Sequence, residues 1–153
     1  MWLQFATSPF LKLMNRYRKL EIIAGAVSLF IGCSMYLLFR NTSINLYRWV
    51  SSTFLGDPVN AMREAVSSWN LPFFVEYSLP DGLYCISYIL IMDALWHDSK
   101  SWARHLIVLS IPLAAILHEL AQGMGIAKGS FDLGDLACYV IPVIIYVIVK
   151  RKK

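Results

Sequence analysis

Carboxylate, amide and imidazole side chains occur together at helical spacing in the C-terminal half of this 153-residue chain. Glu119 and Gln122 are three residues apart, and His118 and Gln122 are four residues apart. Side chains at these spacings lie on one face of a helix. A carboxylate beside an imidazole could bind a cation or carry out general acid–base chemistry.

Two neighbouring segments carry similar groups. Asp132 and Asp135 are three residues apart, Tyr139 follows Asp135 by four, and Asp81 begins another polar stripe. Ionisable groups in membrane segments usually face a bundle interior or a water-filled cavity. If the three helices pack together, their polar stripes meet in one pocket. The residues predicted to bind a ligand there are Asp81, His118, Glu119, Gln122, Asp132, Asp135 and Tyr139.

Each acid in this group also has a simpler structural interpretation. Asp81 follows a proline and Asp132 precedes an apolar run, so either side chain could cap a helix N-terminus. Asp135 lies one turn deeper, which makes capping a weaker explanation. Glu119 is the hardest to explain as a cap, because an acid near a helix C-terminus opposes the helix dipole. We therefore place most weight on Glu119.

These residues form no known catalytic motif. His118-Glu119 is not followed by the second His of H-E-x-x-H, and the chain has neither G-x-S-x-G nor a phosphate-binding loop. Cys33, Cys85 and Cys138 lie in apolar segments without C-x-x-C spacing and are interpreted as packing residues. The sequence leaves the catalytic residues unknown and predicts neither a cofactor nor a metal site.

One further acid lies inside an apolar segment. Asp93 is close in expected depth to His97, Asp98, Arg104 and His105. A charge at this depth is costly without a partner. We predict a structural ion pair between Asp93 and Arg104.

Four apolar segments must position these residues, at approximately 21–39, 82–96, 102–122 and 133–149. The chain is 58% hydrophobic and 16% charged, whereas soluble domains are about 45–50% apolar and about 25% charged. A bilayer core about 30 Å thick needs about 20 helical residues to span it. We predict an all-α, membrane-embedded four-helix bundle that forms a single integral membrane domain over residues 1–153.

Shorter helices are predicted outside these segments. Asp57 and Pro58 are typical of a helix N-cap and first turn, and Pro72 prevents helix just before it. This predicts a short interfacial helix at 58–69, between the first and second spans. Aromatic residues surround it, as at a membrane interface. Residues 1–20 also fit a short interfacial helix.

The distribution of basic residues predicts the orientation. With the N-terminus inside, ten of the 14 basic residues fall on the cytoplasmic side. We expect a multi-pass protein of the cytoplasmic (inner) membrane with both termini in the cytoplasm. The basic residues flank apolar runs, so no nucleic-acid partner is expected despite the net charge of +4. The ten are Lys12, Arg16, Arg18, Lys19, Lys100, Arg104 and residues 150–153.

The C-terminal half resembles the VanZ-like family, small polytopic bacterial membrane proteins named for a teicoplanin-resistance protein. The resemblance rests on E-L-A-Q at 119–122, a glycine-rich loop, and F-D-L-G-D at 131–135. Asp81 and Tyr88 resemble an acid and a following Tyr in the preceding helix of that family. The similar region covers roughly residues 80–149.

The resemblance implies a membrane-embedded pocket facing the cell envelope and a role in glycopeptide antibiotic tolerance. The chain departs from the family pattern at several positions. Gly129 stands in the place of an Arg, Tyr139 in the place of an Asn, and Gly82 and Cys85 in the places of a Lys and a His. Chemistry that depends on those basic side chains is therefore in doubt here.

Three classes of function fit the sequence. The first is an envelope protein that binds a ligand or a membrane protein partner through the polar pocket. The second is a membrane enzyme acting on a lipid-linked substrate, with Glu119 as the base. The third is a small oligomeric channel or effector, which is less favoured because pore linings need polar stripes along whole helices. Membrane lipids are expected partners in all three, and self-association is compatible with each.

Overall fold

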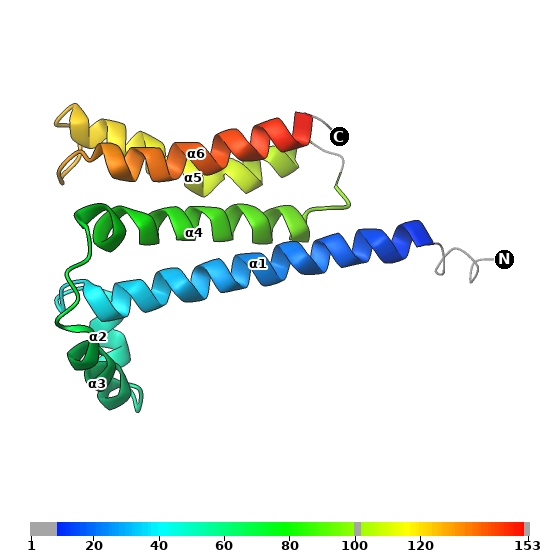
Figure 1. Cartoon of the computed structure of the whole chain (residues 1–153). Helices are drawn as coiled ribbons and strands as arrows, with labels where there is room; N and C mark the ends of the chain where they lie inside the picture. The colour runs from blue at the N-terminus through cyan, green and yellow to red at the C-terminus, as the bar shows by residue number, and fades with distance from the viewer. Residues whose placement is uncertain (1–8, 100–101, 152–153) are drawn as a thin grey trace.

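The computed structural model describes residues 9–99 and 102–151, and its side chains from 16 to 99 and from 102 to 150. This part of the chain is all-α and forms six helices (Figure 1). Four are long and apolar enough to cross a membrane, so the predicted fold class is confirmed. The helices are α1 (Pro9–Phe39), α2 (Asn45–Ser51), α3 (Gly56–Val66), α4 (Phe73–Leu95), α5 (Ala103–Gly123) and α6 (Leu133–Arg151).

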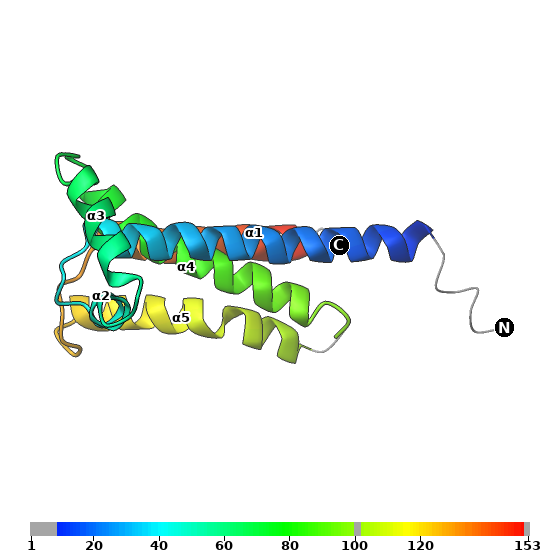
Figure 2. The same cartoon turned by 90° about the horizontal axis from the view of Figure 1, so that it is seen from below.

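Helix α4 is the central helix of the bundle. It lies between α1 and α6 in Figure 1, and Figure 2 shows α5 beside it on another side. In the most apolar window of α4, 44% of residues are buried in the protein, against 11–17% in the other spans. The buried apolar cluster accordingly joins α4, α5 and α6 through Cys85, Ile89, Val108 and Tyr146.

Glycines allow the helices to approach one another closely. A Cβ atom at Gly25 would lie 2.7 Å from the side chain of Ile91, and one at Gly32 would lie 3.4 Å from that of Leu83. Both contacts place α1 against α4. Small residues favour such packing in membranes, where lipid leaves little hydrophobic force to drive helices together.

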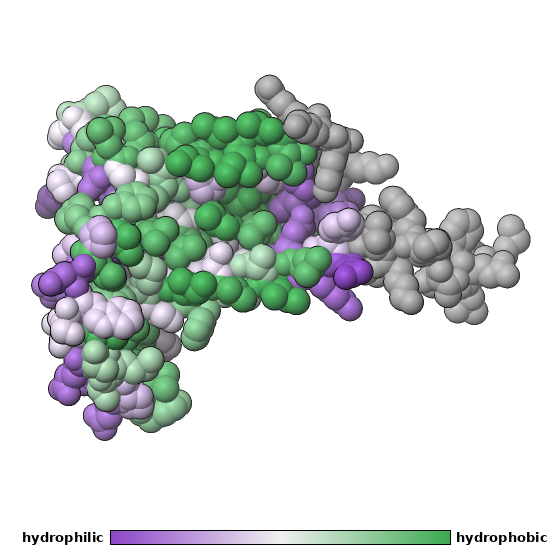
Figure 3. Space-filling model, viewed as in Figure 1, coloured by the Kyte–Doolittle hydropathy of each residue, from purple (hydrophilic) through white to green (hydrophobic). Residues whose placement is uncertain are grey.

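The outer surface of the bundle is strongly apolar. Hydrophobic residues cover the middle of the helices, and hydrophilic residues gather at the two ends (Figure 3). Large apolar side chains such as Phe30, Leu117 and Leu133 are 74%, 66% and 72% exposed. These faces contact membrane lipid. We call the two ends the α3 end, which carries α2 and α3, and the Lys150 end.

The second span differs from the sequence prediction at its start. Helix α4 begins at Phe73, nine residues before the predicted position 82, and Pro80 lies inside it. Pro72 has extended backbone geometry, and its carbonyl accepts the first N–H groups of the helix. A proline inside a membrane helix is tolerated when neighbouring groups satisfy the freed backbone. Asp81 therefore lies in the helix interior, and the prediction that it could cap α4 was wrong.

The segment between the first two spans also differs in detail. It contains two short helices, α2 and α3, where one was predicted at 58–69. Helix α3 begins at Gly56, and no side chain caps it, so Asp57 contributes only a negative charge in the first turn. Residues 9–20 continue directly into α1 and form no separate helix, while residues 1–8 of that predicted segment lie outside the described residues.

Candidate functional site

A cavity of about 200 Å³ lies between α4, α5 and α6, towards the α3 end of the bundle. Two of the predicted ligand-binding residues, Asp81 from α4 and Tyr139 from α6, contribute to its wall. The other walls are mainly apolar. The lining residues are Asp81, Tyr84, Cys85, Ile111, Pro112, Ala115 and Tyr139.

Asp81 connects this cavity to α1. The hydroxyl of Tyr36 donates a hydrogen bond to Asp81 Oδ1 at 3.1 Å, and Arg40 Nη2 lies 3.8 Å from Asp81 Oδ2. The Arg40 guanidinium lies 4.8 Å from the ring centre of Tyr36 and 4.6 Å from that of Tyr77. Sequence reasoning missed Tyr36 and Arg40, although their spacing of four residues at the end of the first span was a usable signal.

Asp135 has no comparable partner for its buried oxygen. Its Oδ1 atom is buried and has no hydrogen-bond partner among the described residues. The Asp135 carboxylate is close enough to Asp81 to interact electrostatically. Ser78, one helical turn before Asp81, provides a second buried oxygen without a partner in the described structure. The contact between α4 and α6 therefore buries a carboxylate oxygen and a hydroxyl group without hydrogen-bond partners, which is costly in a low-dielectric environment.

Tyr139 lies at the centre of the acidic groups. It interacts electrostatically with Asp81, Asp135 and Glu119, which come from three different helices. One acid from each of the three predicted stripes therefore lies within electrostatic range of Tyr139. Whether this region binds a ligand stays a prediction.

Glu119 joins the end of α5 to the start of α6. Its side chain is only 5% exposed, and Oε1 accepts a hydrogen bond of 2.6 Å from the backbone N–H of Asp132. Asp132 Oδ1 in turn accepts a bond of 2.6 Å from the backbone N–H of Gly134. Asp132 thus caps α6, as its structural interpretation predicted. Neither Glu119 nor Asp132 lines the cavity.

His118 and Gln122 form a separate exposed pair. Gln122 Nε2 lies 3.1 Å from His118 Nε2 and donates a second bond of 3.1 Å to the carbonyl of Lys128. These contacts hold the glycine-rich loop against α5. Among the described residues, no three His, Cys, Asp or Glu side chains are placed to hold a metal ion.

A second polar cluster lies at the Lys150 end. Arg104 Nη2 and Nε lie 2.6 and 3.1 Å from Asp93 Oδ1, which confirms the predicted ion pair. Lys150 Nζ lies 2.5 Å from Asp93 Oδ2, and the Tyr146 hydroxyl donates to Oδ1 at 3.2 Å. Sequence reasoning missed Lys150 and Tyr146, which are four residues apart on α6.

No family model, curated protein or solved structure matches the chain. The resemblance to VanZ-like proteins therefore rests on the short motifs alone. The composition and the four apolar helices establish an integral membrane protein with four spans.

Proposed function

We propose that this membrane protein binds an envelope ligand through the cavity lined by Asp81 and Tyr139. The observation that carries the proposal is the buried, unpartnered Oδ1 atom of Asp135 beside Asp81. An ionisable group kept inside a membrane bundle is costly and usually marks a ligand or ion pathway. A ligand with N–H donors would supply the missing hydrogen bonds.

The charge balance favours a positively charged ligand. Asp81 and Asp135 contribute two carboxylates, and among the described residues Arg40, 3.8 Å from Asp81, is paired with Asp81 but not with Asp135. Glu119 adds a third acid within electrostatic range of Tyr139. An ammonium or guanidinium group would therefore be attracted to the cavity, whereas an anion would be repelled.

The proposed location is the cytoplasmic membrane, with both termini inside and the α3 end facing the envelope. The excess of basic residues at the Lys150 end supports this orientation. In this orientation a ligand reaches the cavity from the envelope side, where cell-wall precursors and antibiotics are present.

Thiol labelling in the cavity wall tests both the charge preference and the orientation. Ala115 is half-buried and lines the cavity, and an Ala115→Cys variant with Cys33, Cys85 and Cys138 replaced by Ala has one free thiol there. Intact cells would be treated with two membrane-impermeant methanethiosulfonates, one trimethylammonium and one sulfonate, and each rate would be divided by the rate with a free thiol in solution. We expect the normalised rate of the cationic reagent to be about tenfold higher or more, because a negative cleft concentrates cations.

Asp135→Asn should reduce that preference, whereas the control Asp98→Asn, at the other end of the bundle, should leave it unchanged. Equal normalised rates for the two reagents would refute a cation-selective cavity. Modification of the thiol introduced by Ala115→Cys in inverted vesicles but not in intact cells would refute the orientation.

A narrower function is glycopeptide tolerance. The hydrogen bond between Glu119 and Asp132 supports it, because it connects the two segments whose motifs resemble the VanZ-like family. We expect the protein to raise the minimum inhibitory concentration of teicoplanin in a susceptible Gram-positive host, and Asp135→Asn to abolish the increase. An unchanged inhibitory concentration at equal membrane abundance would exclude this function.

A further inference from the structure

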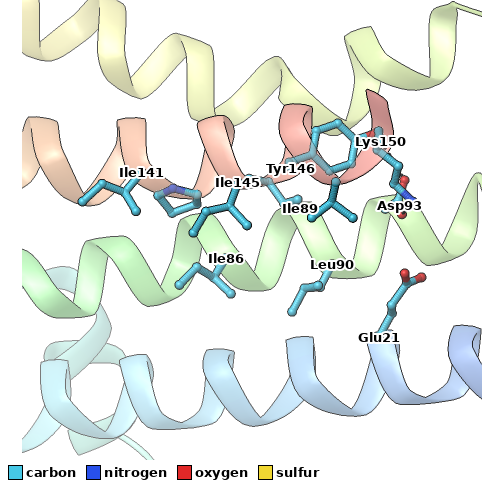
Figure 4. Close-up of a pocket in the computed structure, with 11 residues that line it drawn as sticks. Glu21, Ile86, Ile89, Leu90, Asp93, Ile141, Ile145, Tyr146 and Lys150 are labelled. Carbon is cyan, nitrogen blue, oxygen red and sulfur yellow. Dashed lines mark hydrogen bonds and ion pairs between the residues drawn. The ribbon is translucent and has the colours of Figure 1, made fainter. Parts of the chain in front are cut away.

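A second cavity, of about 280 Å³, forms an apolar groove in the half of the bundle near Lys150. Helices α4 and α6 form the groove, and α1 contributes Glu21 to its lining (Figure 4). Helices α1 and α6 do not contact each other within the described residues, so this side of α4 and α6 is not covered by α1. Its apolar lining residues are Ile86, Ile89, Leu90, Ile141, Pro142, Ile145 and Val149.

The groove has polar side chains at one end only. Glu21 extends from α1 towards the region of Asp93 and Lys150, which lie on α4 and α6 (Figure 4). Asp93 is already paired with Lys150 and Arg104. Glu21 Oε2, in contrast, is buried and has no hydrogen-bond partner among the described residues. The groove thus combines a long apolar surface with one unsatisfied carboxylate.

This arrangement matches an amphiphile better than a protein segment. The volume of about 280 Å³ suits one narrow chain rather than a helix, which with its side chains is about 10–12 Å across. A lipid acyl chain is narrow enough to lie along the isoleucine side chains. Its headgroup would then lie at the polar end, where a buried carboxylate needs a donor.

We propose that this groove is a binding site for a phospholipid whose headgroup carries a primary ammonium. The ammonium donates to Glu21 Oε2, the phosphate accepts from Lys150, and one acyl chain occupies the groove. Lys150 can serve both Asp93 and a phosphate because its ammonium has three N–H donors. A glycerol headgroup offers Glu21 only neutral O–H donors, which bind a carboxylate more weakly than an ammonium does, and a choline headgroup has no N–H to donate.

Native mass spectrometry of the full-length protein can measure this selectivity. The protein would be released from nanodiscs containing phosphatidylethanolamine, its N-methylated derivatives, phosphatidylcholine and phosphatidylglycerol. We expect retention of phosphatidylethanolamine to exceed that of phosphatidylcholine and phosphatidylglycerol by about tenfold, equivalent to about 1.4 kcal/mol. Retention should fall as each methyl group replaces an N–H donor. This lipid series requires no change in the protein.

Variants then assign the selectivity to the groove. Glu21→Gln should abolish the preference for phosphatidylethanolamine, while the matched control Glu64→Gln, on exposed α3, should retain it. Ile145→Trp should reduce the retention of all lipids by filling the groove. Equal retention of the lipids by the wild type, or an unchanged preference in Glu21→Gln, would overturn the proposal.

Photocrosslinking identifies the occupant directly. A benzophenone amino acid at position 145 should give an adduct with the mass of one phospholipid. An adduct with the mass of a second chain would assign the groove to self-association and overturn the lipid site. The site is independent of the Asp81 cavity, so either result leaves the proposed ligand cavity to its own test.

Discussion

The bundle buries Asp93, at one end, differently from Asp81 and Asp135, at the other end. At the Lys150 end, both oxygens of Asp93 have close partners: Arg104 at 2.6 Å and Lys150 at 2.5 Å. At the α3 end, Asp81 has the hydroxyls of Tyr36 and Tyr139 and a guanidinium at 3.8 Å. Asp135 beside it has a buried oxygen with no partner in the described part of the chain.

This difference separates a structural site from a candidate ligand site. A buried acid with two cations needs nothing further, and its main effect is to hold α4, α5 and α6 together. A buried acid with too few donors retains an unmet interaction that a ligand can satisfy. We therefore rank Asp135 above Glu119 as a candidate ligand-binding residue, although the sequence favoured Glu119. Glu119 Oε1 already accepts a hydrogen bond from a backbone N–H group.

Removal of the Asp93 carboxylate should have the largest effect on stability. Asp93→Ala leaves Arg104 and Lys150 without their partner inside the bundle, and breaking a buried pair costs about 3–5 kcal/mol. Denaturant unfolding in mixed micelles, followed by tryptophan fluorescence, measures the free energy of unfolding. The control Asp98→Ala breaks an exposed pair with Arg18 and should cost about 0–1 kcal/mol. Equal losses in the two variants would contradict the comparison.

Removal of Arg40 should have an intermediate effect. Arg40→Gln weakens the interaction with Asp81 and the contacts with the two tyrosine rings, for a loss of about 1.5–3 kcal/mol. The same change makes the cavity more negative, so the cationic thiol reagent should react faster with the thiol introduced by Ala115→Cys. A slower reaction in a folded variant would show that Arg40 does not set the charge of the cavity.

Neutralising Asp135 should cost the least stability. Because its Oδ1 atom has no partner and its charge is costly to bury, we expect Asp135→Asn to lower the free energy of unfolding by less than about 0.5 kcal/mol or to raise it. Asp132→Ala is the control, since loss of a helix cap costs about 1 kcal/mol. Unfolding measured under the same conditions compares the two. A larger loss in Asp135→Asn than in Asp132→Ala would indicate a structural role for Asp135.

The sequence by itself determined the four apolar helices, because an apolar segment can cross a bilayer only in a conformation that satisfies its own backbone hydrogen bonds. It also determined which acids share a helix face, since that depends only on helical spacing. The pair of Asp93 and Arg104 was predictable for the same reason: they lie on either side of one short connection, at matching depth.

Only the tertiary structure decided the partners of each acid. Asp81 meets Tyr36 from a helix 45 residues away, and this depends on how α1 packs against α4 through Gly25 and Gly32. Local sequence does not specify how each helix is rotated about its own axis, because that rotation depends on the packing of two whole helix surfaces. The same reason applies to the unpartnered oxygens of Asp135 and Glu21, because whether a buried oxygen has a partner depends on every helix packed around it.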